Sequence, residues 1–291
     1  MSGPGVVRRL LSARIFRRRL GAAGVILGAA VLIVTVSAPW IAPYDPLAQK
    51  LALRLKPPTL TTSTDGAHPF GTDHLGRDLL TRVLYGGRTS LVISGLSVLL
   101  AGSLGLMLGV LGGYYRRLGD VLIMRLVEIQ LAFPLVLLVL AVVVTLGTTA
   151  RNIVLVFALT SWPIYASIIR GEVLGLESRE FIVAARAIGA SDGVILLRHV
   201  LPNLVSPLTV VASFEFARLL LTEAAIGFLG LGIQPPTPTW GNLLADGRAY
   251  LHDAWWLTAF PGATIALTVA SINFIGDTLR DLVDPRLVNT H

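Results

Sequence analysis

Residues 180–203 read EFIVAARAIGASDGVILLRHVLPN, a charged stretch inside a very hydrophobic chain. Its charges include Glu180, Arg186 and Asp192, and an Asp or Arg at the centre of a bilayer costs about 2.5–3.5 kcal/mol. Its apolar residues nevertheless recur at the helical spacing i, i+3, i+4 and i+7, at Phe181, Ala184, Ala185 and Ile188. The stretch therefore predicts a helix that lies outside the membrane and presents an apolar face.

The same stretch predicts a second helix after a turn. Gly189 can adopt the left-handed conformation that ends a helix. Ser191 can cap the next helix, and Pro202 is expected to end it. Two interpretations of the apolar face stay open at this point: it binds a partner protein, or it folds back onto the chain's own helices.

The composition around this stretch is typical of a membrane protein. The chain has 291 residues, of which 54% are hydrophobic and 14% charged, whereas soluble domains carry about 25% charged residues. The net charge is +7, but the chain has no basic stripe interleaved with aromatic residues of the kind that binds nucleic acid. An excess of positive residues on the cytoplasmic side of a membrane explains the charge better. The chain has no cysteine, which excludes disulfides and thiolate metal sites.

Long uncharged runs predict membrane-spanning helices on both sides of the opening stretch. Five runs have roughly the 17–25 residues that cross a bilayer as a helix. A sixth, weaker candidate contains three charged residues. The sequence thus predicts an all-α membrane protein with about six transmembrane helices and a helix-turn-helix between the fourth and fifth. The expected spans are residues 20–42, 89–115, 129–150, 152–169, 206–233 and 254–276.

The distribution of arginines predicts the orientation. Most of them fall at the N-terminus, in the 116–125 turn, in the 170–205 segment and at the C-terminus, so both termini and the helix-turn-helix are expected in the cytoplasm. The 43–88 loop is also basic, but charge in a longer loop constrains orientation less. The expected organisation is a basic cytoplasmic N-terminus (1–19), a first transmembrane helix (20–42), an extracytoplasmic loop (43–88), a five-helix core (89–279) that includes a cytoplasmic segment (171–203), and a cytoplasmic C-terminus (280–291).

The end of the 43–88 loop predicts a short helix of its own. In GRDLLTRVLYGG, residues 76–87, charged residues alternate with Leu79, Leu80, Val83 and Leu84. This pattern is typical of an amphipathic helix along the membrane interface. A solvated loop helix is the alternative interpretation.

The second span carries a stripe of small residues, Ala101, Gly105, Gly109 and Gly113, at intervals of four. Such a stripe lets two helix backbones approach closely in a membrane. The motif fits packing within the chain or an interface with another subunit, and it does not distinguish them.

Three charged residues of the fifth span, Glu215, Arg218 and Glu223, are costly inside a membrane, so we expect them to face a translocation pathway, a subunit interface or each other. Glu215 and Arg218 are three residues apart on a helix and can form a pair. Glu223 has no basic residue at i±3 or i±4, so we expect it to line a translocation pathway or a subunit interface.

The sequence shows no enzyme site. Its only lysines are Lys50 and Lys56, neither of which follows a glycine, so the chain has no G-x-x-x-x-G-K-[ST] phosphate loop. If ATP drives this protein, another polypeptide binds it. The five histidines form no H-x-x-x-H or H-E-x-x-H pattern, so no zinc site is expected.

The residues from Val183 to Pro202 resemble a known motif. Val183-Ala184-Ala185 with Gly189 and Leu201-Pro202 is similar to the E-A-A-x-x-x-G…L-P cytoplasmic loop of ABC importer permeases. Val183 stands where that family has glutamate and His199 where it has isoleucine, and both departures resemble the C-type permease of the peptide/nickel importers. Further similar stretches are HPFGTDHLGRDLLTRVLYGGRTSL, LTEAAIGFLGLGIQPPTPTWGNLL and NFIGDTLRDLVDPR.

This resemblance implies a function and a set of partners. It implies a permease of the bacterial inner membrane that imports di- or oligopeptides by alternating access, with a B-type permease, one or two kinds of ABC ATPase and an extracytoplasmic substrate-binding protein. ATP and magnesium would be bound by the ATPases, which would dock on Phe181, Ala184, Ala185, Ile188, Gly189 and Pro202. Two alternatives are import of nickel or another metal chelate and, from a different class, a stand-alone secondary transporter that uses Glu223. We find no repeat of the kind that secondary transporters show.

Overall fold

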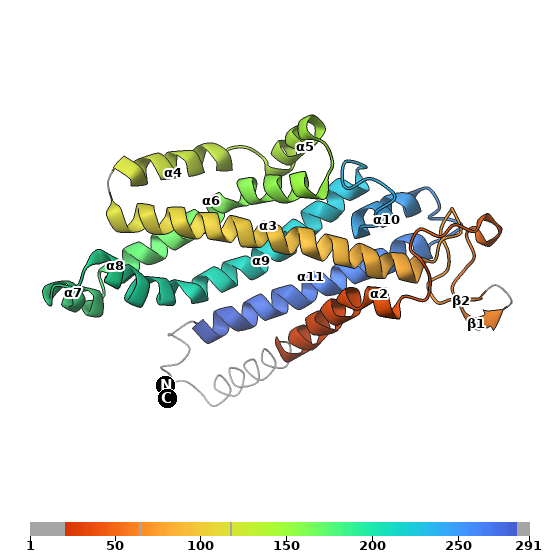
Figure 1. The fold of residues 1–291 in the computed structure, drawn as a ribbon, viewed down its shortest axis with the longest axis horizontal. Coiled ribbons are helices and arrows are strands. Elements are labelled where there is room, and N and C mark those ends of the chain that lie inside the picture. Colours follow the sequence, from red (N-terminus) through yellow and green to blue (C-terminus); the bar gives the residue numbers. More distant parts are fainter. Residues whose placement is uncertain (1–20, 64–65, 117, 284–291) are drawn as a thin grey trace, which may run out of the picture.

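The computed structural model describes residues 21–63, 66–116 and 118–283. The expected N-terminal segment (1–19) and most of the expected C-terminal segment (280–291) lie outside the described residues. Four long helices lie side by side along the longest axis of the molecule (Figure 1). They are α3 (Leu79–Tyr115), α6 (Ala150–Glu177), α9 (Leu201–Phe228) and α11 (Trp256–Val283).

Shorter elements occupy the two ends of this bundle and lie along two of its sides (Figure 1). On one side are α4 (Leu118–Leu131) and α5 (Leu135–Leu146), and on the other are the helix Gly21–Val36 and α2 (Ala38–Ile41). Strands β1 and β2 pair antiparallel, with Thr59 opposite His68 and Ser63 opposite Gly66. Near the other end, a side chain at Gly21 would meet Thr278 of α11, so the first described helix and the last lie together there. The other shorter elements are η1 (Leu51–Leu53), β1 (Thr59–Ser63), β2 (Gly66–His68), α7 (Glu180–Ala187), α8 (Asp192–Ile195), the π-helical turn η2 (Leu196–Val200) and α10 (Trp240–Arg248).

The helices long and apolar enough to span a membrane number four among the described residues, or five if a bent pair counts as one span. The single straight span expected at residues 129–150 is wrong, because this stretch is divided between the two helices of the bent pair, α4 and α5. The chain turns by 86° between the helices on either side of residues 132–134. Pro134 lies at this break; it has no N–H to donate and disfavours helical geometry at Phe133. A continuous apolar run is therefore not a continuous helix here.

The expectation of a separate short helix at residues 76–87 is also wrong. Its residues form the first turns of α3, which continues without interruption to Tyr115. Asp78 caps α3 by accepting a hydrogen bond from the backbone N–H of Thr81 at 2.8 Å. Arg82 is buried against Asp73. The polar residues thus face a buried cluster of charges, neither a membrane interface nor water.

This cluster fixes the loop before α3 onto the bundle. The Asp73 carboxylate accepts hydrogen bonds from Nε of Arg77 at 2.6 Å and Nη1 of Arg82 at 2.5 Å. Asp246 of α10 lies 3.6 Å from each guanidinium. Burial alone would raise the pKa of Asp73, but the backbone N–H of Arg77 and the charges of Arg82 and Arg77 lower it below its ordinary value. The stabilisation is therefore complete above the ordinary Asp pKa of about 3.9 and is lost as the pH falls through the lower folded value.

The stripe of small residues on α3 packs within the chain, against α6. A side chain at Gly109 would come within 2.7 Å of the backbone oxygen of Ala166, and one at Gly113 within 2.8 Å of the Val173 side chain. Gly105 faces Tyr165 in the same way, and Ala101 is fully buried. Of the two interpretations of this stripe, the structure favours packing within the chain.

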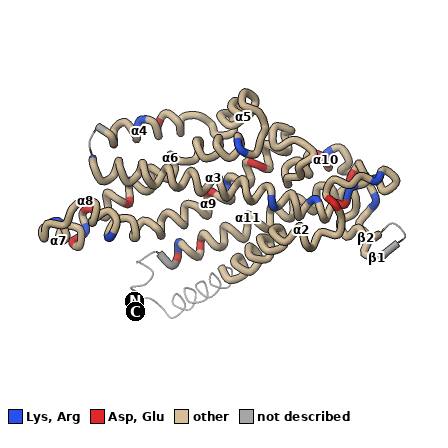
Figure 2. Tube along the Cα trace, in the orientation of Figure 1, with Lys and Arg blue, Asp and Glu red and all other residues tan. Residues whose placement is uncertain are grey.

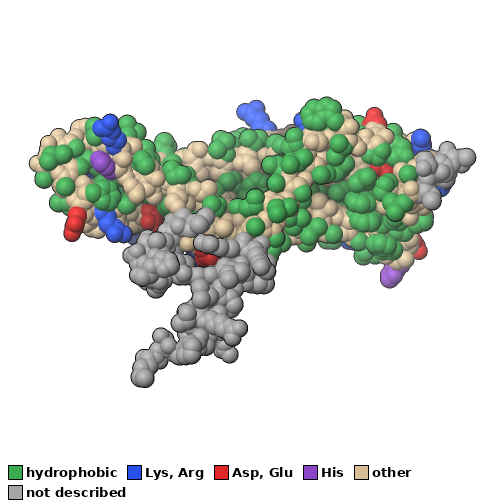
Figure 3. Space-filling view, turned by 90° about the horizontal axis from the view of Figure 1, so that it is seen from below, with side chains coloured by type: hydrophobic (Ala, Val, Ile, Leu, Met, Phe, Trp, Pro, Cys, Tyr) green, Lys and Arg blue, Asp and Glu red, His purple; other side chains and the backbone are tan. Residues whose placement is uncertain are grey.

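The surface separates apolar and charged side chains along the long axis. Most Lys, Arg, Asp and Glu lie toward the two ends of the bundle (Figure 2). Hydrophobic side chains cover most of the body between them (Figure 3). This distribution matches a protein whose middle is surrounded by hydrocarbon and whose ends reach water.

We expect Asp73→Ala to lower the free energy of unfolding by about 3–5 kcal/mol, because it leaves two guanidinium groups buried without their shared carboxylate. Thermal unfolding in detergent, followed by tryptophan fluorescence, measures the change in Tm. Asp45→Ala removes an exposed carboxylate from the same loop and serves as the control. Equal Tm values for the two variants would contradict a stabilising role for the cluster.

Candidate functional site

The helix-turn-helix expected at 180–202 is present as α7 and α8, which we call the coupling segment, residues 180–195. It lies at the end of the bundle remote from β1 and β2 (Figure 1). Gly189 has φ +83°, the left-handed conformation expected at the end of α7. Ser191 occupies the N-cap position of α8 but makes no capping hydrogen bond with its side chain. The turn thus depends on Gly189 more than on Ser191.

The apolar residues of α7 divide between two faces. Phe181, Ala184 and Ile188 are exposed, and Ile188 has 86% of its surface accessible. Ala185 is only 7% exposed and packs with the fully buried Ile182 into the chain's own core. The expectation that Ala185 shares the outward face is therefore wrong. Because Ile182 and Ala185 are also three residues apart, α7 has an apolar stripe toward each side.

Pro202 does not end the second helix. The chain remains helical from Asp192 to Phe228, and Pro202 lies in the first turn of α9. The π-helical turn η2 directly precedes α9. Proline is tolerated in the first turn of a helix because it lacks an N–H that would otherwise need a partner, and a π turn shifts the hydrogen-bond register at that point. The coupling segment is consequently continuous with a long helix of the bundle.

Polar contacts hold the coupling segment to the ends of α3 and α6. The Tyr114 hydroxyl donates to Oδ1 of Asp192 at 2.7 Å, and Arg186 lies over the Tyr114 ring, 5.4 Å from its centre. Arg186 also donates to Glu177 at 2.9 Å, and Glu177 pairs with Arg116 at 2.7 Å. Members of this network are up to 78 residues apart in the chain, so residue spacing gives no signal of it.

The helices α4 and α6 are joined near the same end by a further ion pair, Arg170–Asp120. Nε and Nη2 of Arg170 each donate to the Asp120 carboxylate at 2.7 Å, a bidentate geometry. Such pairs fix direction as well as distance. The end of the bundle that carries α7 is thus tied together by directional polar contacts.

Within the bundle, Glu215 and Arg218 form the pair that their spacing suggests. Nη2 of Arg218 lies 2.5 Å from Oε2 of Glu215 and 3.1 Å from the Ser161 hydroxyl of α6. Glu215 is buried, whereas the Arg218 side chain is 35% exposed. The guanidinium therefore neutralises a buried carboxylate and still reaches the surface of this chain.

Glu223 has no such pairing. Its side chain is 2% exposed, and neither carboxylate oxygen has a hydrogen-bond partner among the described residues. It lies close to Ser90 of α3 and to Thr239, the N-cap of α10. The carboxylate is thus enclosed by this chain at the start of α10, which differs from the expectation that it lines a pathway or a subunit interface.

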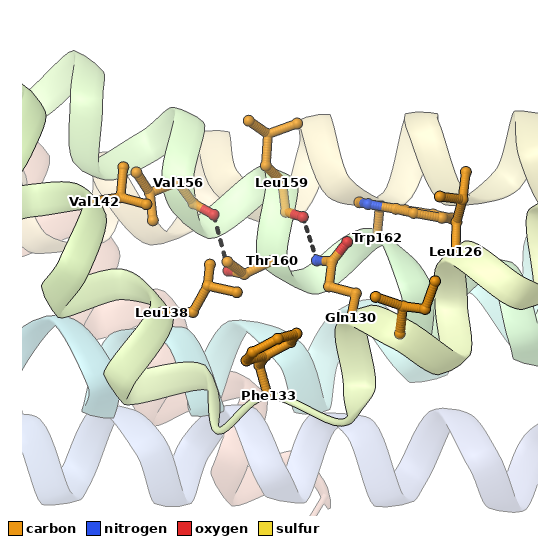
Figure 4. Close-up of a pocket in the computed structure, with 10 residues that line it drawn as sticks. Leu126, Gln130, Phe133, Leu138, Val142, Val156, Leu159, Thr160 and Trp162 are labelled. Carbon is orange, nitrogen blue, oxygen red and sulfur yellow. Dashed lines mark hydrogen bonds between the residues drawn. The ribbon is translucent and has the colours of Figure 1, made fainter.

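An apolar cavity of about 390 Å³ lies between the bent pair α4–α5 and α6 (Figure 4). Two of its polar side chains bond within the chain, since Gln130 donates to the backbone oxygen of Leu159 and Thr160 donates to that of Val156 (Figure 4). The cavity could therefore hold an apolar group by shape and apolar contact. Its walls are Leu126, Ile129, Gln130, Phe133, Leu138, Val142, Val156, Leu159, Thr160 and Trp162.

Among the described residues, no group of three or more His, Cys, Asp or Glu side chains is arranged to hold a metal ion. The buried charges described above form ion pairs or, at Glu223, stand alone.

Comparison with known proteins defines the class. Residues 105–289 match the inner membrane component of binding-protein-dependent transport systems, and residues 9–58 match the N-terminal transmembrane domain of oligopeptide transport permease C. This chain belongs to the family of binding-protein-dependent transport system inner membrane components. It is therefore a membrane component of a transport system and not an enzyme.

Individual relatives show which transport proteins this chain resembles. The chain is 42% identical to the di/tripeptide transport system permease protein DppC of Pseudomonas aeruginosa, over 94% of this chain and 91% of that protein. It is 41% identical to the dipeptide transport system permease protein DppC of Escherichia coli K12, over the same shares. Two structures of the MetNI methionine ABC transporter share the fold, with TM-scores of 0.57 and 0.56 at 19% and 21% identity, covering 70% and 71% of this chain and 96% and 98% of theirs.

We expect Glu223→Gln to raise the Tm while lowering transport. An unpaired buried carboxylate costs free energy that a neutral amide of the same shape avoids. A residue kept at a cost to stability is expected to serve function. The measurements are the Tm in detergent and uptake by the assembled transporter. Glu223→Leu, which also removes the polar atoms, should lower uptake at least as far; wild-type uptake by both variants would exclude a role in transport.

Proposed function

We propose that this chain is the C-type permease subunit of an ATP-driven importer that carries di- or oligopeptides into the cytoplasm. Relatives named for dipeptide or di/tripeptide transport support the peptide substrate, because their similarity extends over nearly the whole chain. The resemblance of residues 183–202 to the cytoplasmic loop of ABC importer permeases supports coupling to ATP. A second, B-type permease and an extracytoplasmic substrate-binding protein complete the proposed assembly.

The observation that carries this proposal is the exposed face of α7. Phe181, Ala184 and Ile188 present apolar surface at the end of the bundle, beyond the long spans. Exposed apolar patches on stable proteins mark interaction sites. Small residues such as Ala184 allow a partner surface to approach closely. We propose that the ATPase subunits, which hold ATP and magnesium, dock on this face.

The proposed mechanism is alternating access. When the ATPases close on ATP, they move the coupling segment, and the attached helices reorient so that a cavity facing the binding protein opens to the cytoplasm. Of the three intramembrane charges, Arg218 is the one whose side chain reaches the surface of this chain. We place it toward the pathway or the second permease, with Glu215 as its neutralising partner. Glu223 acts from within the chain.

Ile188→Glu is expected to abolish copurification of the ATPase and substrate-stimulated hydrolysis together. The new carboxylate is hydrated in the free permease and loses its water on docking. Burying an unpaired charge costs several kcal/mol, and about 4 kcal/mol weakens binding roughly a thousandfold. The chain should still insert and fold, because the side chain makes little contact with it.

Two controls sharpen this test. Arg179→Ala lies outside the exposed apolar face and should leave docking nearly unchanged. Ala185→Glu introduces the same charge on the buried side of α7 and should disrupt the coupling segment itself, with a loss of stability that Ile188→Glu does not show. A stoichiometric ATPase and normal uptake with Ile188→Glu would rule out docking on this face.

We further propose that the protein lies in the bacterial inner membrane with both termini and the coupling segment in the cytoplasm and residues 43–78 on the outside. The excess of arginine at the termini and around the coupling segment supports this orientation. The adjacency of Gly21 and Thr278 supports placing both termini on one side.

Thiol labelling tests the orientation, since the native chain has no cysteine. Leu60 and Arg179 are both exposed and lie at opposite ends of the bundle. With an impermeant reagent on intact cells, Leu60→Cys should be labelled and Arg179→Cys should be labelled only after lysis. The reverse pattern would invert the proposed topology.

A further inference from the structure

Helix α3 runs the length of the bundle and is held by polar contacts at both ends. Its 37 residues contain no proline and extend about 55 Å at 1.5 Å per residue. At one end Arg82 binds Asp73 at 2.5 Å and approaches Asp246 of α10 at 3.6 Å. At the other end Tyr114 donates to Asp192 at 2.7 Å. One rigid element thus joins the coupling segment to the opposite end of the molecule.

Tyr114 contacts both helices of the coupling segment. Its hydroxyl bonds to Asp192, the first residue of α8, and its ring lies beneath Arg186 in the last turn of α7. The ring also packs in one buried apolar cluster with Ile182 and Ile195. One side chain therefore connects the end of α3 to each half of the helix-turn-helix.

The polar contact adds a property that apolar packing lacks. Apolar contact is non-directional, so α7 and α8 could rotate or slide on an apolar surface at little cost in free energy. A hydrogen bond to a carboxylate and a cation over an aromatic ring both require a defined geometry. With both in place, a displacement of the coupling segment must carry the end of α3 with it.

We propose that Tyr114 is a positioning residue that transmits movement of the coupling segment to α3, and through α3 to the Asp73–Arg82–Asp246 cluster at the opposite end. This inference rests on the proposed docking of an ATPase to α7. It assigns Tyr114 a role in coupling hydrolysis to transport that is separate from docking. The close packing of α3 on α6 through Gly105, Gly109 and Gly113 makes the two helices move together.

Tyr114→Phe removes only the hydroxyl, with its hydrogen bond to Asp192 and its interaction with Arg186. It keeps the ring beneath the Arg186 guanidinium and within the apolar cluster. Tyr115→Phe is the matched control, because the neighbouring Tyr115 is 51% exposed and lies edge-on to Tyr114. Each variant is purified as the assembled transporter with its ATPase and reconstituted for uptake and hydrolysis. A spin label at Val194→Cys on α8, in an otherwise cysteine-free chain, reports movement of the coupling segment.

For Tyr114→Phe we expect wild-type stoichiometry of the ATPase, retained hydrolysis, a more mobile spin label and about a tenfold fall in uptake per ATP hydrolysed. Tyr115→Phe should match the wild type in all four. Asp192→Ala should reproduce the Tyr114→Phe defect, the double variant should be no worse than either single variant, and Asp192→Asn, which keeps an acceptor oxygen, should be milder.

Three results would overturn the coupling role: an unchanged label, a wild-type ratio of uptake to hydrolysis, or loss of the ATPase from Tyr114→Phe, which would make the residue part of the docking surface. If no ATPase copurifies with the wild-type chain, the docking proposal is wrong, and the coupling role that depends on it is wrong as well. Normal docking with an unchanged ratio overturns the coupling role alone.

Discussion

The close approach of α3 and α6 is the contact on which the rest of the structure depends. Lipid provides no hydrophobic drive for helices to associate, so backbone proximity and van der Waals packing must supply it. Gly109 and Gly113 leave room for the backbone of α6 at Ala166 and for the Val173 side chain. The resulting pair forms a rigid frame, against which α9 packs along its length, and the coupling segment is attached at the end of that frame.

Three sets of buried charges among the described residues are accommodated in different ways. Asp73 and Arg82 are enclosed in a cluster with several hydrogen bonds, which fixes the loop before α3. Glu215 is neutralised by one partner that remains partly accessible. Glu223 is buried with no bonded partner among the described residues. Of the groups in this part of the chain, only the hydroxyls of Ser90 and Thr239 are placed to solvate this carboxyl group, so of the three arrangements it adds least to stability.

The coupling segment shows how far helical spacing can be interpreted. Spacing predicted a helix over 180–188 and a glycine turn at Gly189, and both are present. It also grouped Ala185 with Ile188, although Ala185 is buried and Ile188 is exposed, because α7 carries apolar residues on a buried face and on an exposed face. Pro202 was expected to end a helix and instead lies in the first turn of α9, where the missing N–H is tolerated.

The class of the protein follows from its amino-acid sequence: low charge and long apolar runs indicate a membrane protein, and the motifs in their order indicate the family. The local pair Glu215–Arg218 also follows from the sequence, because three residues on one helix fix that distance. Four features become visible only in the folded chain: α3 begins at residue 79, α4 and α5 bend apart, Glu223 lies beside Ser90 and Thr239, and Tyr114 bonds to Asp192. Local patterns report the chain's own geometry, whereas these contacts join residues far apart in sequence, and only packing of the helices brings them within reach.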